Sequence, residues 1–487
     1  MYLEKISLSN FRCFSEAPMT VKLEQDLTCL VGNNGSGKTT LAMALKRLFG
    51  STREERTITR EDFYLAPKED PKEINGREMY IEVTFSFPEL IKDTEKARET
   101  CPAFSSVIYA DKKDGELKAR MRLEALWDEA EYEDEVSSKI YWITTPNDVE
   151  FGEGKDFKLT VPSHDRKYIK LRYVPAFRDS KVTLRNEVKT LTKILEDYTS
   201  VSNSDQKEIE SISENLSDKV QNLEAIKTTT ALLKKIWSET HDKTLTHYQD
   251  PKLEATPTEI GELLRSISIK LSPSETGGSR DINELSDGQI SLLYFTLAIA
   301  LYEIEQEHNE GNAKGFKYLD RDIPVFTIFV FEEPENHLSP YYLGRVLDIL
   351  YKKTKSFKTT GIVTSHSPSV VRRMDRVEQI RYFRQETTPN SRRSIIKEIQ
   401  LPSNKSDDDY KYINQAILAH PELYFSKLVL LGEGDSEEIV IPQLAKIFDL
   451  DLDPLSVERV IECFHDDRKT LRLSVSRIFL RRGAVYR

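Results

Sequence analysis

Residues 27–40 read Leu-Thr-Cys-Leu-Val-Gly-Asn-Asn-Gly-Ser-Gly-Lys-Thr-Thr, and this stretch decides the fold. The short apolar run 27–31 predicts a buried strand, and the spacing of apolar residues over 40–49 predicts a helix. Between them, 32–39 matches the pattern G-x-x-x-x-G-K-T. Glycines let such a loop turn its backbone N–H groups inward around a phosphate, and the following helix points its positive end at the same anion. The stretch therefore predicts a phosphate-binding loop between a strand and a helix.

The residues of this loop have expected contacts with a nucleotide. Lys38 is expected to reach the β- and γ-phosphates, and the Thr39 hydroxyl is expected to ligate Mg²⁺. The other loop residues expected to bind the nucleotide are Asn33, Asn34, Gly35, Ser36, Gly37 and Thr40. The alternative is a glycine-rich turn with a surface lysine, and the flanking strand and helix favour the phosphate loop.

The bulk composition narrows the class of protein. A chain of 487 residues predicts two to four domains, and the net charge of −11 excludes a uniformly basic nucleic-acid surface but not a local basic groove. The four cysteines have no metal-ligand spacing, which fits reduced thiols in a cytoplasmic protein. No run of about twenty apolar residues exists, and the N-terminus lacks the pattern of a signal peptide. We therefore expect a cytoplasmic protein without a membrane-spanning segment.

The first third of the chain predicts considerable antiparallel strand. Strands are expected over 3–14, 79–87, 117–123, 139–145 and 168–175, with a hairpin around Asp114-Gly115. The strand 79–87 alternates polar and apolar residues, which is typical of a half-buried strand.

Three basic residues, Lys118, Arg120 and Arg122, share one face of the strand 117–123. This face could touch DNA, but a plain solvated strand face is favoured.

From about 183 to 245 the sequence predicts long polar helices. Ile209, Ile212, Leu216, Leu223 and Ile226 form an apolar stripe at helical spacing. We expect a helical hairpin or short coiled coil inserted in the rest of the domain. The stripe could pack on that domain or on a second subunit, and the sequence does not choose between them.

The continuous apolar run 325–331 predicts a buried parallel strand, and 359–364 predicts another buried strand. The first is followed by Glu332-Glu-Pro-Glu335 and the second by His366, so both strands end in polar functional residues. A strand is also expected over 267–271, and 284–289 opens an apolar helix that continues to 304. These features predict a doubly wound α/β sheet with its site at the carboxyl ends of the strands.

The ordered motifs at 32–39, 285–289, 331–335 and 365–366 resemble those of ABC-type ATPase heads, and specifically the OLD (overcoming lysogenization defect) family. The resemblance implies an ABC-type head, with a parallel core sheet and an antiparallel β subdomain. The expected parts are 1–182 and 251–400 for the head, 183–250 for the helical insertion and 420–487 for a partial Toprim-like domain.

The resemblance also implies roles for individual residues. Glu333 would orient or deprotonate the attacking water, Glu332 would help to hold Mg²⁺, and His366 would contact the γ-phosphate. Glu332 stands where many relatives carry Asp, and a carboxylate one methylene longer still suits water-mediated coordination. The signature residues implied to close on the γ-phosphate of another subunit are Ser286, Gly288 and Gln289. A nucleotide held between two heads implies at least a homodimer, and the same resemblance implies DNA as an activator.

The last ninety residues resemble the start of a Toprim domain, in which Glu433 and Glu437 would ligate Mg²⁺. The alternative is a strand and helix whose acids merely suit a helix N-terminus. The later acidic pair that a Toprim site needs is not found at the expected place, since Asp466-Asp467 is one strand early and a basic stretch follows it. This part of the chain is therefore expected to be cut short or completed by a partner.

The expected reaction is Mg²⁺-dependent hydrolysis of ATP by an OLD-like ATPase of DNA processing or anti-phage defence. Two alternatives stay open. One is an ATP-gated DNA endonuclease that acts through the Toprim site. The other is a non-catalytic ATP-dependent clamp that recruits a separate effector protein.

Overall fold

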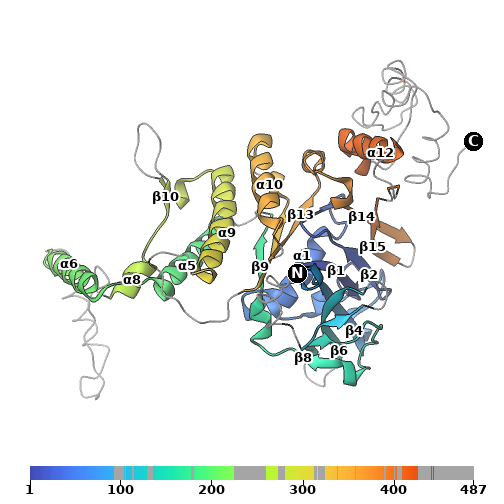
Figure 1. Ribbon diagram of the computed structural model, residues 1–487, viewed down its shortest axis with the longest axis horizontal. Helices are drawn as coiled ribbons and strands as arrows, with labels where there is room; N and C mark the ends of the chain where they lie inside the picture. The colour runs from blue at the N-terminus through green and yellow to red at the C-terminus, as the bar shows by residue number, and fades with distance from the viewer. Residues whose placement is uncertain are drawn as a thin grey trace, which may run out of the picture. The chain divides into compact units, whose positions relative to one another are not determined.

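The computed structural model divides into two compact units, whose elements are labelled in Figure 1. Unit 1 holds Met1–Phe177 and Asp322–Arg487, and unit 2 holds Arg178–Arg321. The structure describes residues 1–92, 106–111, 115–128, 135–176, 180–223, 259–271, 280–311, 324–336, 338–356, 358–388, 391–399, 401–402 and 408–425, together with 104, 227, 315, 440 and 443.

Unit 1 is built on a six-stranded sheet. In spatial order its strands are β15 (Ser391–Glu398), β14 (Ile380–Thr388), β3 (Leu27–Val31), β13 (Thr359–Ser365), β12 (Phe326–Glu332) and β9 (Ile169–Val174). β15 pairs antiparallel with β14, and all the other neighbours pair parallel. The strands β3, β12 and β13 are buried along their whole length, as is expected of the central strands of a parallel sheet. The expected parallel α/β core is present.

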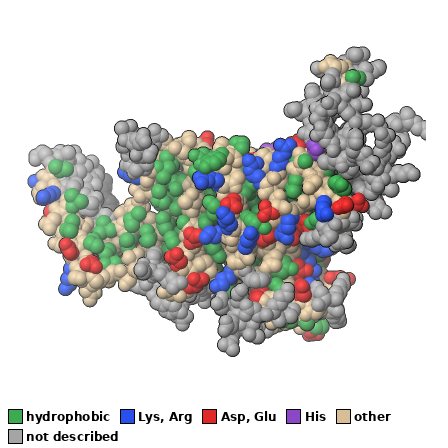
Figure 2. Space-filling model, turned by 45° about the horizontal axis from the view of Figure 1, so that its top comes forward, with side chains coloured by type: hydrophobic (Ala, Val, Ile, Leu, Met, Phe, Trp, Pro, Cys, Tyr) green, Lys and Arg blue, Asp and Glu red, His purple; other side chains and the backbone are tan. Residues whose placement is uncertain are grey.

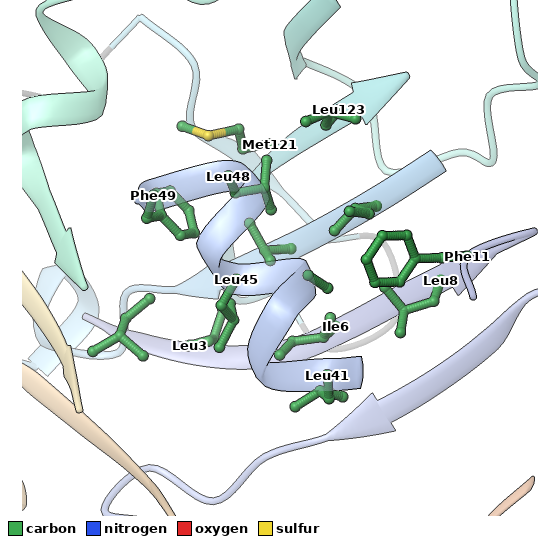
Figure 3. Packing of buried hydrophobic residues seen from close by; sticks show 14 of the residues in the cluster. Leu3, Ile6, Leu8, Phe11, Leu41, Leu45, Leu48, Phe49, Met121 and Leu123 are labelled. Atoms are coloured by element: carbon green, nitrogen blue, oxygen red, sulfur yellow. The ribbon is translucent and has the colours of Figure 1, made fainter. Parts of the chain in front are cut away.

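Helix α1 (Lys38–Phe49) follows β3 and lies in the main hydrophobic core of unit 1. Figure 3 shows its buried face, with Leu41, Leu45 and Leu48, against residues of the neighbouring strands. Leu3, Ile6 and Leu8 come from β1, and Met121 and Leu123 come from β6. Burial of each leucine contributes about 1.5 to 3 kcal/mol, so this packing holds α1 against the neighbouring strands.

The other helices of unit 1 are shorter or lie later in the chain. They are α2 (Arg53–Arg56), α3 (Glu89–Lys92), α10 (Pro340–Thr354), α11 (Pro368–Val371) and α12 (Asp408–Ala419), with 3-10 turns at Arg60–Asp62, Pro71–Glu73, Lys155–Phe157, Asp165–Tyr168, Pro334–Asn336, Val377–Gln379 and Pro421–Tyr424.

The second sheet of unit 1 is antiparallel. Its strands follow the order β2 (Met19–Lys22), β1 (Tyr2–Ser9), β4 (Arg77–Ser86), β6 (Leu117–Asp128), β7 (Glu135–Ile143) and β8 (Lys158–Thr160), and β5 (Tyr109–Ala110) pairs with β6. The pairing of β5 with β6 forms the hairpin expected in this region. The predicted antiparallel region is therefore confirmed.

The polar face of this antiparallel sheet is not solvated, and here the prediction was wrong. Arg120 and Arg122 are buried and both pair with Glu82, whose carboxylate lies 2.9 Å from Arg120 Nε and 2.7 Å from Arg122 Nε. Backbone carbonyls of Thr145 and Val149 accept hydrogen bonds from the same guanidinium groups. The loop after β7 thus covers the face, and β4 is buried on both sides rather than half-buried.

Lys118 is also buried, so the basic face 118–122 is not accessible to DNA. Its ammonium pairs with Glu4 at 3.3 Å and with Asp111 at 3.1 Å. The surface shown in Figure 2 mixes Lys and Arg side chains with Asp and Glu.

Unit 2 contains the helices α5 (Ser180–Tyr198), α6 (Asn203–Gln221), α8 (Ile260–Arg265) and α9 (Asp287–Asn309), with β10 (Lys270–Leu271), β11 (Arg280–Asp281) and a 3-10 turn at Ile282–Glu284. α5 packs against α8 and α9. Only the last two residues of the strand expected over 267–271 are extended in a pair, since β10 is that short. The long helices predicted after residue 183 are thus present in α5 and α6.

The apolar stripe of α6 is exposed in the structure. Ile209, Ile212, Leu216 and Leu223 are all exposed, with Ile212 at 61%. Ile226 and most of 224–258 lie outside the described residues, so the inserted hairpin stays a prediction. Among the described helices, none combines the length and the apolar character needed to cross a membrane.

Candidate nucleotide-binding site

The loop 32–37 joins β3 to α1 and is shaped by its glycines. Gly32 has φ 153°, and a Cβ atom there would lie 2.2 Å from the carbonyl oxygen of Phe383. Gly37 caps α1 with φ 101°, and a Cβ atom there would lie 2.9 Å from Cys13 Sγ. Side chains at these two positions would therefore collide with β14 and with the segment after β1.

Lys38 is the first residue of α1 and is buried at 4% exposure. Its ammonium donates hydrogen bonds to the carbonyl oxygens of Gly32, at 2.6 Å, and Asn33, at 3.0 Å. The loop therefore curves around the lysine head group, in the place where the sequence predicts a phosphate-binding ammonium.

Burial lowers the pKa of Lys38, and the nearby carboxylates of Glu333, Glu335 and Glu332 act in the opposite direction. The net direction is downward. A phosphate group beside this ammonium would favour its charged form, because opposite charges stabilise each other most where water is excluded.

The remaining loop residues differ in accessibility. Asn33, Asn34, Gly35 and Thr39 are exposed, so their polar groups face solvent at the start of α1. Ser36 is buried, and its Oγ has no hydrogen-bond partner among the described residues. Thr40 is half-buried, and its hydroxyl accepts a hydrogen bond from the Cys13 thiol at 3.3 Å.

Glu332 ends strand β12 and is buried at 5% exposure. Its Oε2 accepts a hydrogen bond from the Tyr173 hydroxyl at 2.5 Å and a longer one from the Ala176 N–H at 3.5 Å. Its Oε1 is buried and, within the part of the chain that the structure describes, has no partner. One oxygen is thus anchored while the other keeps its full capacity as an acceptor.

Glu333 follows directly and has an uncommon backbone conformation. Its φ is 44°, in the left-handed region, which costs a residue with a side chain roughly 1 kcal/mol or more. The backbone is held there because its N–H donates to the carbonyl oxygen of Thr364 at 2.9 Å. Asn336 Nδ2 donates to Glu333 Oε2 at 2.9 Å, which orients the carboxylate. The left-handed backbone of Glu333 is therefore held by its hydrogen bond to β13.

His366 follows β13 and lies beside two carboxylates. Its Nδ1 is 3.3 Å from Glu333 Oε1 and 3.5 Å from Glu335 Oε1, although neither approach has hydrogen-bond geometry. Glu335 Oε1 accepts hydrogen bonds from the Ser365 hydroxyl at 2.6 Å and from the His366 N–H at 3.1 Å. Glu335 therefore ties the turn after β12 to the turn after β13.

The sheet order explains why these residues meet. β13 lies between β3 and β12, and all three strands run parallel, so the phosphate-binding loop, the glutamates and the histidine emerge at the same edge. The structure thus brings together Lys38, Glu332, Glu333 and His366, as the sequence predicts. It adds two residues to which the sequence gave no role, Tyr173 and Glu335. Glu335 stood in the quoted 331–335 motif, whereas Tyr173 carried no signal that identifies its partner.

The signature residues lie in unit 2, at the start of α9. Ser286 and Gln289 are exposed, and Gly288 is half-buried. The Gln289 Oε1 atom accepts hydrogen bonds from the Ser286 N–H at 3.1 Å and from its hydroxyl at 3.2 Å. The N-terminus of α9 is therefore accessible at the signature, which is what a contact with a phosphate requires.

Glu433 and Glu437 lie outside the described residues, and so does Asp466-Asp467. Among the residues with described positions, no group of three or more His, Cys, Asp or Glu side chains could hold a metal ion by itself.

Comparisons with known proteins give the family. The family model described as AAA ATPase domain matches residues 1–371 of the chain. A curated relative, the chromosome partition protein Smc of Halothermothrix orenii, is 34% identical over 77 residues, which is 15% of this chain and 6% of that protein. The match therefore spans only a small part of that relative's length.

Solved structures of SMC heads are also similar at low identity. The SMC head bound to the C-winged helix domain of ScpA has 15% identity and a TM-score of 0.38, covering 82% of this chain and 98% of that chain. The SMC head domain from Thermotoga maritima has 15% identity and a TM-score of 0.35, covering 82% and 100%. The family match extends over well more than half of the 487 residues. The chain belongs to the AAA ATPase domain family and is an ATPase.

Proposed function

We propose that the chain is an OLD-like ATPase with an ABC-type head, which hydrolyses ATP with Mg²⁺ between the heads of two copies. The observation that carries this proposal is the grouping of Lys38, Glu332, Glu333 and His366 at the carboxyl ends of β3, β12 and β13. In this arrangement the Lys38 ammonium lies in the glycine-rich loop and interacts electrostatically with nearby glutamate carboxylates, as a site for phosphate and a metal ion requires.

The donor set fits Mg²⁺. Thr39 offers an exposed hydroxyl at the start of α1, and Glu332 offers a buried carboxylate oxygen without a partner among the described residues. Both are hard oxygen ligands, which this ion prefers. When bound, Mg²⁺ would neutralise charge on the phosphates, and Lys38 would add its ammonium to the β- and γ-phosphates.

Glu333 is the proposed general base for the attacking water. Its Oε2 is oriented by Asn336 and its Oε1 lies near His366, so both oxygens are directed toward the edge where β12 and β13 end. His366 is the proposed contact to the γ-phosphate. Glu333 would thus act on the attacking water, and His366 would act on the transferred phosphoryl group.

The second copy would supply Ser286, Gly288 and Gln289 from the N-terminus of its α9. The exposure of Ser286 and Gln289 supports this role, because a buried signature could not reach a nucleotide on another molecule. Participation in DNA processing or anti-phage defence, with DNA as an activator, rests on the OLD resemblance. The curated relative is named for chromosome partition.

The test is ATP turnover by the purified chain, with Mg²⁺ and with EDTA. We expect turnover only with Mg²⁺, faster turnover when double-stranded DNA is added, and none for Lys38→Ala. Hydrolysis by Lys38→Ala at the parental rate would place the site elsewhere. Turnover that is unaffected by DNA would leave the ATPase but remove DNA as an activator.

For the C-terminal part we propose a Toprim-like region in which Glu433 and Glu437 ligate Mg²⁺ but do not by themselves suffice for cleavage. Two-metal cleavage needs several carboxylates around two ions about 4 Å apart. The chain alone should therefore cut DNA poorly with Mg²⁺ or Mn²⁺, with or without ATP. Robust nicking that is lost in Glu433→Ala would contradict this and support the ATP-gated nuclease.

A further inference from the structure

A short hydrogen bond to the site comes from Tyr173, a residue for which the sequence predicts no role. Tyr173 lies in β9, the neighbour of β12, and faces Val330 in the strand register. Its hydroxyl donates to Glu332 Oε2 at 2.5 Å, and the Ala176 N–H reaches the same oxygen at 3.5 Å. Hydrogen bonds of an O–H group to a carboxylate are short and about twice as strong as neutral ones.

Glu332 needs such an anchor more than an aspartate would. Its side chain has one more rotatable bond, so the carboxylate at the end of β12 can sample more positions before it binds anything. Anchoring Oε2 removes this freedom and leaves Oε1, which is buried and has no partner among the described residues, in a fixed place. The hydrogen bond from Tyr173 therefore preorganises the Glu332 carboxylate for binding.

Tyr173 is itself held by the helix that carries the phosphate-binding loop. The Lys46 ammonium of α1 lies 4.6 Å from the centre of the Tyr173 ring, and Lys46 also pairs with Glu55 at 3.2 Å. The contact of a cation with the ring face is attractive. A chain of contacts thus runs from α1 through the Tyr173 ring to Glu332, and it joins the two sides of the nucleotide site.

We propose that Tyr173 is a positioning residue that fixes Glu332 for Mg²⁺. This inference rests on the proposed function, since it needs Glu332 beside the metal ion. It assigns the hydroxyl of Tyr173 a role in metal affinity and none in contacting the nucleotide.

The first experiment measures metal binding rather than turnover. Mn²⁺ is titrated, with free ion followed by electron paramagnetic resonance, into the full chain saturated with a non-hydrolysable ATP analogue. Tyr173→Phe keeps the ring that packs on Lys46 and removes only the hydroxyl. We expect Mn²⁺ affinity to fall about tenfold, as is typical when a partner of a metal-binding side chain is lost. Binding of the analogue in EDTA should not change.

Tyr168→Phe is the matched control. Tyr168 precedes β9, and its ring packs on Phe104, away from Glu332. Its loss of a hydroxyl should leave Mn²⁺ affinity unchanged. An equal loss in both variants would show a general weakening of this edge of the sheet and would overturn the inference.

A double-variant cycle provides the sharper test. In a Glu332→Asp background the carboxylate is one methylene shorter and no longer reaches the Tyr173 hydroxyl. Tyr173→Phe should then have no further effect on Mn²⁺ affinity. The same tenfold loss in that background would overturn the inference, because the effect would not pass through Glu332.

The failure of this inference can be told from the failure of the proposed function. If Glu332→Ala lowers Mn²⁺ affinity but Tyr173→Phe does not, Glu332 binds the metal ion and Tyr173 has no positioning role. If Glu332→Ala leaves Mn²⁺ affinity unchanged, Glu332 does not bind the metal ion, and the proposed metal site and the positioning role of Tyr173 are both wrong.

Discussion

Two glycines of the phosphate-binding loop should respond very differently to the same added methyl group. At Gly32 the φ of 153° is unfavourable for alanine, and the new Cβ would lie 2.2 Å from the Phe383 carbonyl oxygen. That carbonyl belongs to β14, which is paired on both sides by β3 and β15, so it cannot move away freely. At Gly35 the φ of 77° is also unfavourable, but nothing lies within 4 Å of the new atom.

The expected loss of stability differs between the two alanine variants. Backbone strain at Gly32 costs about 1 to 3 kcal/mol, and forcing the methyl group against fixed backbone adds about 1 to 3 kcal/mol. Gly32→Ala should therefore destabilise unit 1 by about 2 to 6 kcal/mol. Gly35→Ala carries strain alone, and we expect about 1 kcal/mol.

The assay is urea unfolding followed by tryptophan fluorescence, since Trp127 and Trp142 are buried in unit 1. ATP binding is measured in parallel. Gly32→Ala should lower the midpoint strongly and lose ATP binding, whereas Gly35→Ala should lower it slightly. Equal midpoints for the two variants, or a Gly32→Ala variant as stable as the parent, would refute the close approach of the loop to β14.

Two further predictions concern charge. Glu82→Ala leaves the buried guanidinium groups of Arg120 and Arg122 without their carboxylate, so the free energy of unfolding in urea should fall by about 3 to 5 kcal/mol. The control Glu78→Ala, at an exposed position of the same strand, should leave the free energy of unfolding almost unchanged. Similar losses of stability in the two variants would contradict the buried network. Because burial lowers the pKa of Lys38 and bound phosphate would raise it again, ATP binding should take up protons, increasingly as the pH rises toward the ordinary pKa of lysine, and affinity should fall over the same range. Calorimetry in buffers of different ionisation enthalpy measures the uptake. Proton release, or equal uptake by Lys38→Arg, would contradict this reasoning.

The sequence predicts the buried strands, because their residues suit the central positions that these strands have in the sheet. The stretches 27–31, 325–331 and 359–364, which predict buried strands, correspond to β3, β12 and β13. The residues that follow them meet at one edge because parallel strands share a direction, so the grouping of Lys38, Glu333 and His366 is also predictable.

The sequence could not predict features that depend on segments distant along the chain. The alternation in 79–87 indicates one solvated face, but a loop at 145–149 covers it and Glu82 becomes buried beneath two arginines. Alternation reports which residues share a face and not what lies over that face. The contact of Tyr173 with Glu332 is of the same kind, since it joins residues 159 positions apart.

We propose that Glu333 activates water for ATP hydrolysis at the edge where β12 and β13 end. Glu333→Gln keeps the size of the side chain and its bond from Asn336 but removes the base. Turnover of ATP with Mg²⁺ should fall by about 100-fold or more, while ATP stays bound and light scattering shows twice the mass of the free chain. Turnover by Glu333→Gln at the parental rate would contradict the account.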